Sequence, residues 1–411
     1  MAKIKPFQGY RPPPDIAGTV SSPPYDVISS DEARNMVQDN PSSFLHVIKP
    51  EIDFTPSNEP KGDTLHEHGS ANLQRFINGG KLVQDKNPCF YIYQIKMGDH
   101  TQTGIMAAVS IEEYNQGLIK KHEFTRPDKE NDRTRHIEIT NANTGPVFLI
   151  FSNDGEYQNK VSQIKNQSPD ISFTAEDETI HTLWKTDSAD QINIITDYFQ
   201  SIPSLYIADG HHRAASASRV QKIKKDTNTH HNGDELYNYF LSVIFPHDEM
   251  QILGYNRIVK DLNELSEEEF LKSIESSFSL IPNPASLTPD SSHTFSMFLN
   301  EKWYRLEAKE HIISDDPVEG LDASILQNHL LAPILDIDNP RTNNRIDFVG
   351  GIRGLKELER RCILDAKIAF ALYPVSIDDL LAVADAGKVM PPKSTWFEPK
   401  LRSGMVVRLL E

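Results

Sequence analysis

The run Asp209-Gly-His-His-Arg213 places an acid, two imidazoles and a guanidinium where an apolar segment gives way to a polar one. Tyr206 to Ala208 has the character of the end of a buried strand, and Ala214 to Lys225 has the Ala-, Lys- and Arg-rich composition of a helix. Gly210 permits a tight turn between the two. The two histidines and the arginine are therefore expected at a helix N-terminus, where unpaired backbone N–H groups and the helix dipole attract anions.

Two interpretations of this run are open from the sequence. In the first, Arg213 adds a bidentate grip on phosphate oxygens, with His211 and His212 beside it. In the second, Asp209 only caps the helix and the two histidines are surface residues. A phosphate or metal site is predicted by the first interpretation alone.

A second candidate segment is Ser22-Pro-Pro-Tyr-Asp-Val-Ile28. Its paired prolines fix the backbone, so Tyr25 and Asp26 would project from a stiff loop toward a substrate. The alternative is an ordinary turn that leads into a helix.

The third candidate is Lys121-His-Glu-Phe-Thr125, where Glu123 beside His122 could serve as a general base or a magnesium ligand. The alternative is a charged loop after a strand. The cations of the following run, Lys129 to Arg135, could contact phosphate or pair with the acidic residues among them.

The closing segment, Val389 to Gly404, gathers cations and hydroxyl groups in a chain that is otherwise strongly acidic. Such a set fits phosphate, and its Pro-Pro turn is typical of a positioned functional loop. Trp396 and Phe397 could stack a base, although large aromatic side chains more often fill a core. The phosphate-binding candidates are Lys393, Ser394, Thr395, Lys400 and Arg402, with Ser403 as a further hydroxyl.

Strands and helices interleave along the chain, which predicts a mixed α/β fold. The helices are expected from Ser29 or Ser30 to about Asp39 and from Asp63 to Asn78, before Gly79-Gly80. The expected strands are Leu45 to Ile48, Phe90 to Lys96 and Thr103 to Ile111 as an antiparallel hairpin, Val147 to Phe151, and Leu241 to Phe245. Neither a Walker loop nor a Gly-x-Gly-x-x-Gly fingerprint occurs.

Length and charge limit the classes of function. A chain of 411 residues predicts two lobes, which we place at residues 1–245 and 246–411, with the closing segment returning to the N-terminal lobe. The formal charge of −17 argues against a nucleic-acid partner, because binding to a phosphate backbone needs a dense cationic face. A small anion in a local basic pocket stays compatible with that charge.

Cysteine usage and hydropathy predict where the protein works. Cys89 and Cys362 are the only cysteines, too few for a disulfide framework, so a reducing cytoplasm is the expected location. No secretory signal is visible in the N-terminal residues, and no apolar run approaches the roughly 20 residues needed to cross a bilayer. We therefore expect no membrane partner.

With these segments in view, the chain resembles, nearly end to end, a bacterial and archaeal family known as domain of unknown function 1015. The family name states no activity, so the resemblance itself assigns none. The matching motifs, in order, are Pro6-Phe7 with Arg11, Pro23-Pro-Tyr-Asp-Val-Ile28, His122-Glu123 with Thr125, Asp209-Gly-His-His-Arg213, and Met390-Pro-Pro-Lys-Ser-Thr-Trp-Phe-Glu-Pro-Lys-Leu-Arg402.

The Asp209 to Arg213 element also resembles the nucleotide site of the ParB and sulfiredoxin superfamily, whose members include kinases of free serine. That resemblance implies phosphoryl transfer from ATP or ADP, with Mg²⁺ at Asp209 and Glu123 as the candidate base. The DNA-partition role of ParB does not transfer, because the acidic charge opposes it. The catalytic set is then Glu123, Asp209 and His212; the phosphate set adds Gly210, His211 and Arg213 to the closing-segment candidates; Tyr25, Asp26, His122 and Glu398 are expected at the substrate.

The predicted function is a cytoplasmic, nucleotide-dependent kinase of a small hydroxylated metabolite, with free L-serine as the first candidate. Phosphoryl transfer depends on positioning and on neutralising charge at phosphoryl oxygens, and the candidate segments contain the required groups. One alternative is a metal-dependent hydrolase that uses Asp209, His211, His212 and Glu123 as ligands. The other is a regulator that binds nucleotide without turning it over.

Overall fold

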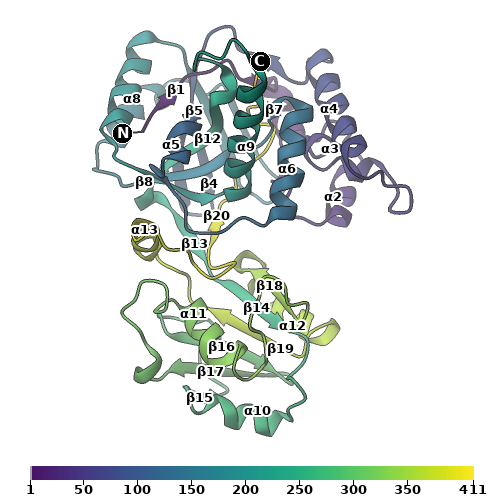
Figure 1. Ribbon diagram of the computed structural model, residues 1–411, viewed down its shortest axis with the longest axis vertical. Coiled ribbons are helices and arrows are strands. Elements are labelled where there is room, and N and C mark those ends of the chain that lie inside the picture. Colours follow the sequence, from purple (N-terminus) through teal and green to yellow (C-terminus); the bar gives the residue numbers. More distant parts are fainter. Residues whose placement is uncertain (1) are drawn as a thin grey trace. The chain divides into compact units, whose positions relative to one another are not determined.

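The computed structural model describes residues 2–411, and these form two compact units of a mixed α/β protein (Figure 1). Unit 1 contains residues 2–121, 125–250 and 399–411, and unit 2 contains residues 122–124 and 251–398. The chain therefore enters unit 2 briefly after Lys121, and the closing segment is divided between the two units.

Unit 1 is built on a nine-stranded mixed sheet. Eight of its strands run in the order β6-β11-β8-β12-β5-β4-β10-β9, and β1 pairs with β5. Two pairs are parallel, β11 with β6 and β12 with β8, and the remaining pairs are antiparallel. The strands are β1 (Ile4–Lys5), β4 (Phe90–Met97), β5 (His100–Ser110), β6 (Ile119–Lys120), β8 (Val147–Phe151), β9 (Ile171–Thr174), β10 (Ile180–Thr186), β11 (Leu205–Asp209) and β12 (Tyr239–Pro246).

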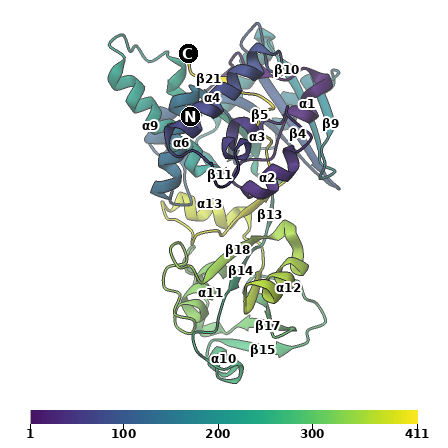
Figure 2. The same cartoon turned by 90° about the vertical axis from the view of Figure 1, so that its right-hand side faces the viewer.

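Helices cover this sheet, and four of them lie in a row, with α9 beside α6, α6 beside α4, and α4 beside α3 (Figures 1 and 2). Residues of β8, β11, β12 and α9 share one apolar core, which fixes the junction between β11 and α9. The helices are α1 (Ala17–Val20), α2 (Ser30–Val37), α3 (Leu45–Ile48), α4 (Asp63–Asn78), α5 (Ile111–Asn115), α6 (Pro127–Thr140), α7 (Tyr157–Lys165), α8 (Ala189–Ser201) and α9 (His211–Thr227).

Several elements expected from the sequence are confirmed. The α4 helix spans Asp63–Asn78, β4 and β5 form an antiparallel hairpin, and every residue of β8 is buried. The α2 helix starts at the expected cap, because Ser29 and Glu32 form a reciprocal capping box.

The expected strand at Leu45 to Ile48 is wrong, since these residues form the short helix α3. Phe44, Val47 and Ile48 follow the helical i, i+3, i+4 spacing, and all three are buried in the same cluster. The Phe44 carbonyl accepts the backbone N–H groups of Val47 and Ile48, at 2.9 and 3.2 Å. A short apolar run does not reveal its period from residue types alone, which explains the error.

The charged run after Thr125 is also a helix, α6. Pro127 stands in its first turn with Asp128, and Asn141 ends it in the left-handed conformation at φ 51°. Arg133 pairs with Asp132 at 2.6 Å, as the alternative for the run predicted, whereas Arg135 pairs with Asp63, outside the run, at 2.7 Å.

Residues 399–411 complete unit 1. Strand β21 (Arg408–Leu409) pairs antiparallel with β7 (Ala142–Asn143), and Tyr10, which lies in β2 (Tyr10–Arg11) opposite β3 (Val83–Gln84), bridges to Val407. The guanidinium of Arg408 is buried and donates to the carbonyls of Tyr239 and Leu236, at 2.9 and 2.6 Å. The closing residues are therefore an integral part of this core.

Unit 2 is built on a six-stranded antiparallel sheet in the order β15-β17-β16-β19-β14-β18. Its apolar residues form two clusters. The strands are β14 (Tyr255–Val259), β15 (Phe278–Pro282), β16 (Thr294–Leu299), β17 (Lys302–Ala308), β18 (Ile346–Gly350) and β19 (Ile368–Leu372), with a separate pair β13 (Gln251–Leu253) and β20 (Trp396–Glu398). The helices are α10 (Glu267–Ile274), α11 (Asp322–Leu326), α12 (Gly354–Leu364) and α13 (Ile377–Asp385).

One carboxyl group of unit 2 is buried at the start of α11. Asp322 is 7% exposed, and its Oδ1 accepts the backbone N–H of His293 at 2.7 Å. Within residues 2–411 its Oδ2 has no hydrogen-bond partner. Burial raises the pKa of Asp322 to about 6, because the charged form loses its hydration.

Two further observations bear on the classes of function. Across residues 2–411, every helix is too short or too polar to cross a bilayer. Cys89 and Cys362 are both free thiols.

Candidate functional site

The run from Asp209 to Arg213 forms the predicted strand, turn and helix N-terminus. Asp209 ends β11, Gly210 adopts φ 96°, and α9 starts at His211. The Asp209 carboxylate accepts the backbone N–H of Gly210 at 2.9 Å, which tightens the turn. A Cβ at residue 210 would lie only 3.1 Å from Nε of Arg213, so the arginine folds back over this glycine.

Replacing Gly210 by alanine is therefore expected to cost about 1–2 kcal/mol of unfolding free energy from the left-handed conformation alone. The new methyl group would also displace the Arg213 guanidinium. Chemical denaturation checks the stability, and Gly233→Ala is the matched control, because Gly233 also has a positive φ, 97°, but open space around its Cβ position. An equal effect in both variants would contradict a role for Gly210 in seating Arg213.

Arg213 is the centre of a cluster of charges. Its side chain is 10% exposed, and its Nη2 lies 3.6 Å from Oδ2 of both Asp26 and Asp209. Its Nη1 donates to the carbonyl of Pro146. Burial alone would lower the pKa of Arg213, but the two carboxylates outweigh it and raise the pKa, so the guanidinium stays charged.

Lys400 joins this cluster from the closing segment. Its Nζ lies 3.5 Å from Oδ2 of Asp209. The side chains of Asp26 and Asp209 are 35% and 29% exposed, whereas those of Arg213 and Lys400 are 10% and 17% exposed. The fold thus assembles four charged groups from three distant parts of the chain, with the carboxylates more open to solvent than the cations.

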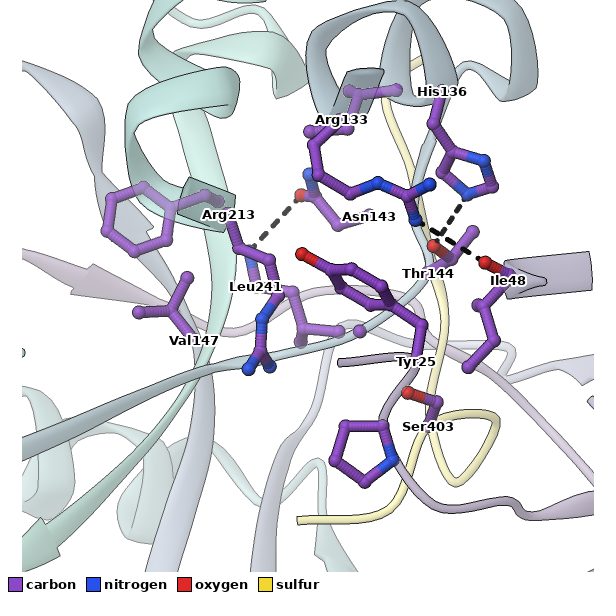
Figure 3. A pocket seen from close by; sticks show the side chains of 14 residues that line it. Tyr25, Ile48, Arg133, His136, Asn143, Thr144, Val147, Arg213, Leu241 and Ser403 are labelled. Carbon is purple, nitrogen blue, oxygen red and sulfur yellow. Dashed lines mark hydrogen bonds between the residues drawn. The ribbon is translucent and has the colours of Figure 1, made fainter. Parts of the chain in front are cut away.

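Tyr25 lines the same cavity as Arg213. The guanidinium of Arg133 stacks over its ring at 4.2 Å, and burial, followed by the charge of Asp26, raises the pKa of the Tyr25 hydroxyl. Its ring lines a cavity of about 30 Å³, which Figure 3 shows together with its other polar side chains. A cavity of that volume has room for about one or two water molecules, and not for a nucleotide. The other polar side chains around it are Arg133, His136, Asn143, Thr144, Arg213 and Ser403.

The two histidines of the run differ in setting. His211 is buried, at 6% exposure, in the first turn of α9. Nε2 of His212 accepts the backbone N–H of Arg126 at 3.0 Å, immediately before α6. His212 therefore joins α9 to α6, and its Nδ1 carries the proton of the neutral ring.

Arg402 lies in unit 1 but has partners outside the Arg213 cluster, which consists of Asp26, Asp209, Arg213 and Lys400. Its Nε lies 3.3 Å from Nε2 of His181, its Nη1 3.5 Å from the carbonyl of Ser21, and its Nη2 3.6 Å from Asp177. This setting was not foreseen from the sequence, which grouped Arg402 with Lys400 because the two residues are neighbours in the chain.

The remaining predicted site residues belong to unit 2. There the carbonyl of His122 accepts the backbone N–H of Met390 at 2.8 Å, and Oγ1 of Thr395 lies 3.4 Å from Nε2 of the same histidine. Within unit 2 the fold thus joins the His122–Phe124 segment, which contains Glu123, to the closing segment. Lys393 lies over the ring of Tyr255, at 5.4 Å.

Ser394 and Glu398 make local contacts in the same unit. Oγ of Ser394 donates to the carbonyl of Pro391 at 2.8 Å, and Glu398 accepts the indole N–H of Trp396 at 2.7 Å. Trp396 packs edge-on against Tyr255, and a Cβ at Gly350 would lie 2.6 Å from the indole ring. These contacts agree with the interpretation that Trp396 packs against its neighbours.

The donor set of unit 1 suits magnesium better than a transition metal. Among residues 2–411, no three His, Cys, Asp or Glu side chains are grouped as a metal site. Asp26 and Asp209 nevertheless place two carboxylates around one guanidinium. Magnesium is commonly held by one or two carboxylates together with substrate phosphates, so these two residues fit it.

A family model described as "Protein of unknown function (DUF1015)" matches residues 4–324 of the chain, and this match decides the family. The chain belongs to the DUF1015 family. No curated protein matches this DUF1015 chain in sequence.

Three solved structures are similar to parts of the DUF1015 chain at low identity. A free serine kinase in complex with AMP has 12% identity and a TM-score of 0.33, covering 72% of this chain and 86% of its own. SbnI with a C-terminal truncation, from Staphylococcus aureus, has 10% identity and a TM-score of 0.39, covering 74% and 87%. A conserved hypothetical protein from Pyrococcus furiosus has 13% identity and a TM-score of 0.36, covering 74% and 95%.

Proposed function

We propose that this DUF1015 protein binds a nucleotide at the Arg213 cluster and transfers a phosphoryl group to a small hydroxylated metabolite. The observation that carries the proposal is the meeting of Arg213, Lys400 and Asp209 at the N-terminus of α9. Two cations and the positive end of a helix dipole are the groups that bind phosphate oxygens. Catalysis of phosphoryl transfer requires little beyond such positioning and charge neutralisation.

The charges in the cluster balance, so a bound polyphosphate could replace the carboxylates as the partner of the two cations. Asp26 and Asp209 carry two negative charges, and Arg213 and Lys400 carry two positive charges, so the cluster is neutral by itself. An incoming polyphosphate would compete with the carboxylates for the two cations. The released carboxylates would then favour a divalent cation.

Asp209 and Asp26 are the residues that would hold Mg²⁺. When bound, the ion would neutralise charge on the phosphate oxygens. The chain's own contribution is to hold Arg213 rigidly, through the Pro146 carbonyl and the Gly210 turn, so that its Nη atoms need no reorganisation.

The acceptor is proposed to be a small hydroxylated metabolite, with free L-serine as the first candidate. The candidate general base from the sequence, Glu123, stays a prediction, and Glu123→Gln tests it in the assay below. His212 stays a candidate for proton transfer through Nδ1, because its Nε2 accepts the backbone N–H of Arg126.

The test is to incubate the purified full-length protein with ATP or ADP, Mg²⁺ and a panel of hydroxylated metabolites that includes L-serine. Phosphorylated product is detected by mass spectrometry. Asp209→Asn is expected to lower the rate by about 100-fold, because it removes a carboxylate that would hold Mg²⁺ at the phosphate oxygens. The matched control is Asp226→Asn, an exposed aspartate near the other end of the same helix, which is expected to leave the rate unchanged.

The outcomes separate the functions considered. Tight nucleotide binding without any product from the panel would favour a regulator that senses nucleotide. Zinc or manganese retained through purification, together with hydrolysis of a substrate, would favour a metal-dependent hydrolase. Absence of nucleotide binding altogether would overturn the proposal.

A further inference from the structure

Unit 1 contains a second, larger pocket, which is lined in part by Ser21, Ser22 and Pro23. Its volume is about 410 Å³, and it lies against α1, the residues around α2, and β9. Pro23 lines this pocket, while Pro24 and Tyr25 line the 30 Å³ cavity next to Arg213. The lining includes hydroxyl and amide groups of Thr19, Ser21, Ser22, Asn40, Ser43, Ser172 and Thr174.

The buried guanidinium of Arg402 lines this pocket, and a hydrogen bond to His181 fixes its orientation. Arg402 is 8% exposed, and its Nε–H donates to Nε2 of His181. Burial, and then the charge of Arg402, lowers the pKa of His181 to about 3, so the ring is neutral. Nδ1 of His181 therefore carries the proton and donates it to Oη of the fully buried Tyr93, at 2.8 Å.

The contacts that Arg402 makes with its partners are long for a guanidinium. Its three contacts span 3.3 to 3.6 Å, whereas charge-assisted bonds of a guanidinium to oxygen are about 2.7–2.9 Å long. The one carboxylate among them, Asp177, is 62% exposed, which weakens its interaction. A buried guanidinium with such long contacts can form a shorter and stronger bond to the oxyanion of a ligand.

Two hydroxyl groups beside Arg402 add to that capacity. Ser21 and Ser22 are 5% and 1% exposed, and both line the pocket. Within the part of the chain that the structure describes, Oγ of each has no hydrogen-bond partner. Buried hydroxyls are normally bonded, so Ser21 and Ser22 each have an unused bonding capacity beside Arg402.

Acidic residues line the exposed part of the same pocket. Asp15 and Glu176 are exposed and belong to the lining, so the pocket combines a buried positive charge with negative charges open to solvent. A simple anion would be attracted at Arg402 but repelled by the two carboxylates. A zwitterion satisfies both, with a carboxylate at Arg402 and an ammonium group near Asp15 and Glu176.

We propose that this pocket binds a free α-amino acid, with its carboxylate on Arg402, Ser21 and Ser22. The pocket is distinct from the Arg213 cluster, and binding there requires no phosphoryl transfer. This inference therefore stands whether or not the proposed function holds.

The test is titration calorimetry of the purified full-length protein with each of the twenty standard L-amino acids. The best binder is then compared with its carboxamide, which lacks the carboxylate, and with its 2-hydroxy acid, which lacks the ammonium group. Each analogue is expected to bind at least about 10-fold more weakly. Equal binding of the amino acid and both analogues, or no binding by any amino acid, would overturn the proposal.

Variants assign the binding to this pocket. Arg402→Gln is expected to weaken it at least about 30-fold, because the ligand carboxylate would lose its charged partner. Should that variant fail to fold, as judged by circular dichroism, Glu176→Gln supplies the test and is expected to weaken binding about two- to five-fold. Glu178→Gln is the matched control, an exposed glutamate two residues away that does not line the pocket. Undiminished affinity in the folded Arg402 variant, or in the Glu176 variant where it stands in, would refute the assignment, while ATP titration of the same variants reports on the Arg213 cluster separately.

Discussion

Arg213→Ala is expected to lower phosphoryl transfer by about 100- to 1,000-fold and to weaken nucleotide binding. The substitution removes the central cation of the cluster, which lies 3.6 Å from both Asp26 and Asp209, and leaves Lys400 alone to offset two carboxylates. The excess of negative charge would then repel a polyphosphate. Loss of one preorganised donor to a transferring group typically costs an enzyme a factor of this size.

A matched control for Arg213 lies on the same helix, at Arg219. Arg219 is 43% exposed and pairs with Glu130 at 3.2 Å, so Arg219→Ala removes an equal charge without touching the cluster. We expect its rate and nucleotide affinity to equal those of the unchanged protein. Arg213→Lys should resemble the alanine variant, because a single ammonium group cannot reach the Pro146 carbonyl and both carboxylates as a planar fork does. Equal nucleotide affinity in all three variants would place the binding site elsewhere.

Asp322→Asn is expected to raise the free energy of unfolding by about 2–3 kcal/mol at pH 7.5, and to change it little at pH 4. Burial raises the pKa of Asp322 from 3.8 to about 6 in the folded state. Between these two values the folded protein binds more protons than the unfolded chain, so this group makes stability fall as the pH rises from about 4 to about 6. Above pH 6 the full cost of the buried charge remains, and asparagine removes it.

Urea denaturation of both proteins between pH 4 and pH 8 measures this effect. Asparagine keeps an oxygen that can accept the backbone N–H of His293, so the hydrogen bond at 2.7 Å is retained. Asp338→Asn, at an exposed aspartate of the same unit, is the control and should shift the curve little at any pH. A variant curve parallel to that of the unchanged protein across this range would show that Asp322 is not the responsible group.

Elements with a complete local signal were predictable from the sequence. The α4 helix combines apolar periodicity with a glycine pair at its end, and the β4–β5 hairpin combines alternation with a polar turn. The α3 helix was missed because a four-residue run with three apolar side chains fits either period. The signals of α6, Pro127 in the first turn and Asn141 after the last, were present but were hidden by the density of charge between them.

The site could be predicted only where its residues are neighbours in the chain. The turn at Gly210 and the helix N-terminus follow from local residue types. The approach of Lys400 to Asp209, 191 residues away, follows from the path of the whole chain and has no local signal. The same limit explains Arg402, whose partners Ser21 and His181 come from segments that the sequence analysis did not associate with it.

The discontinuity of unit 1 has a consequence for its biosynthesis. A nascent polypeptide that has emerged as far as Glu398 contains all of unit 2 and every strand of the nine-stranded sheet, but lacks Lys400 and β21. The carbonyls of Tyr239 and Leu236 that Arg408 later occupies would still face water. The charge cluster around Asp209 can thus be assembled only after residues 399–411 have joined unit 1, by which time all of unit 2 has already been synthesised.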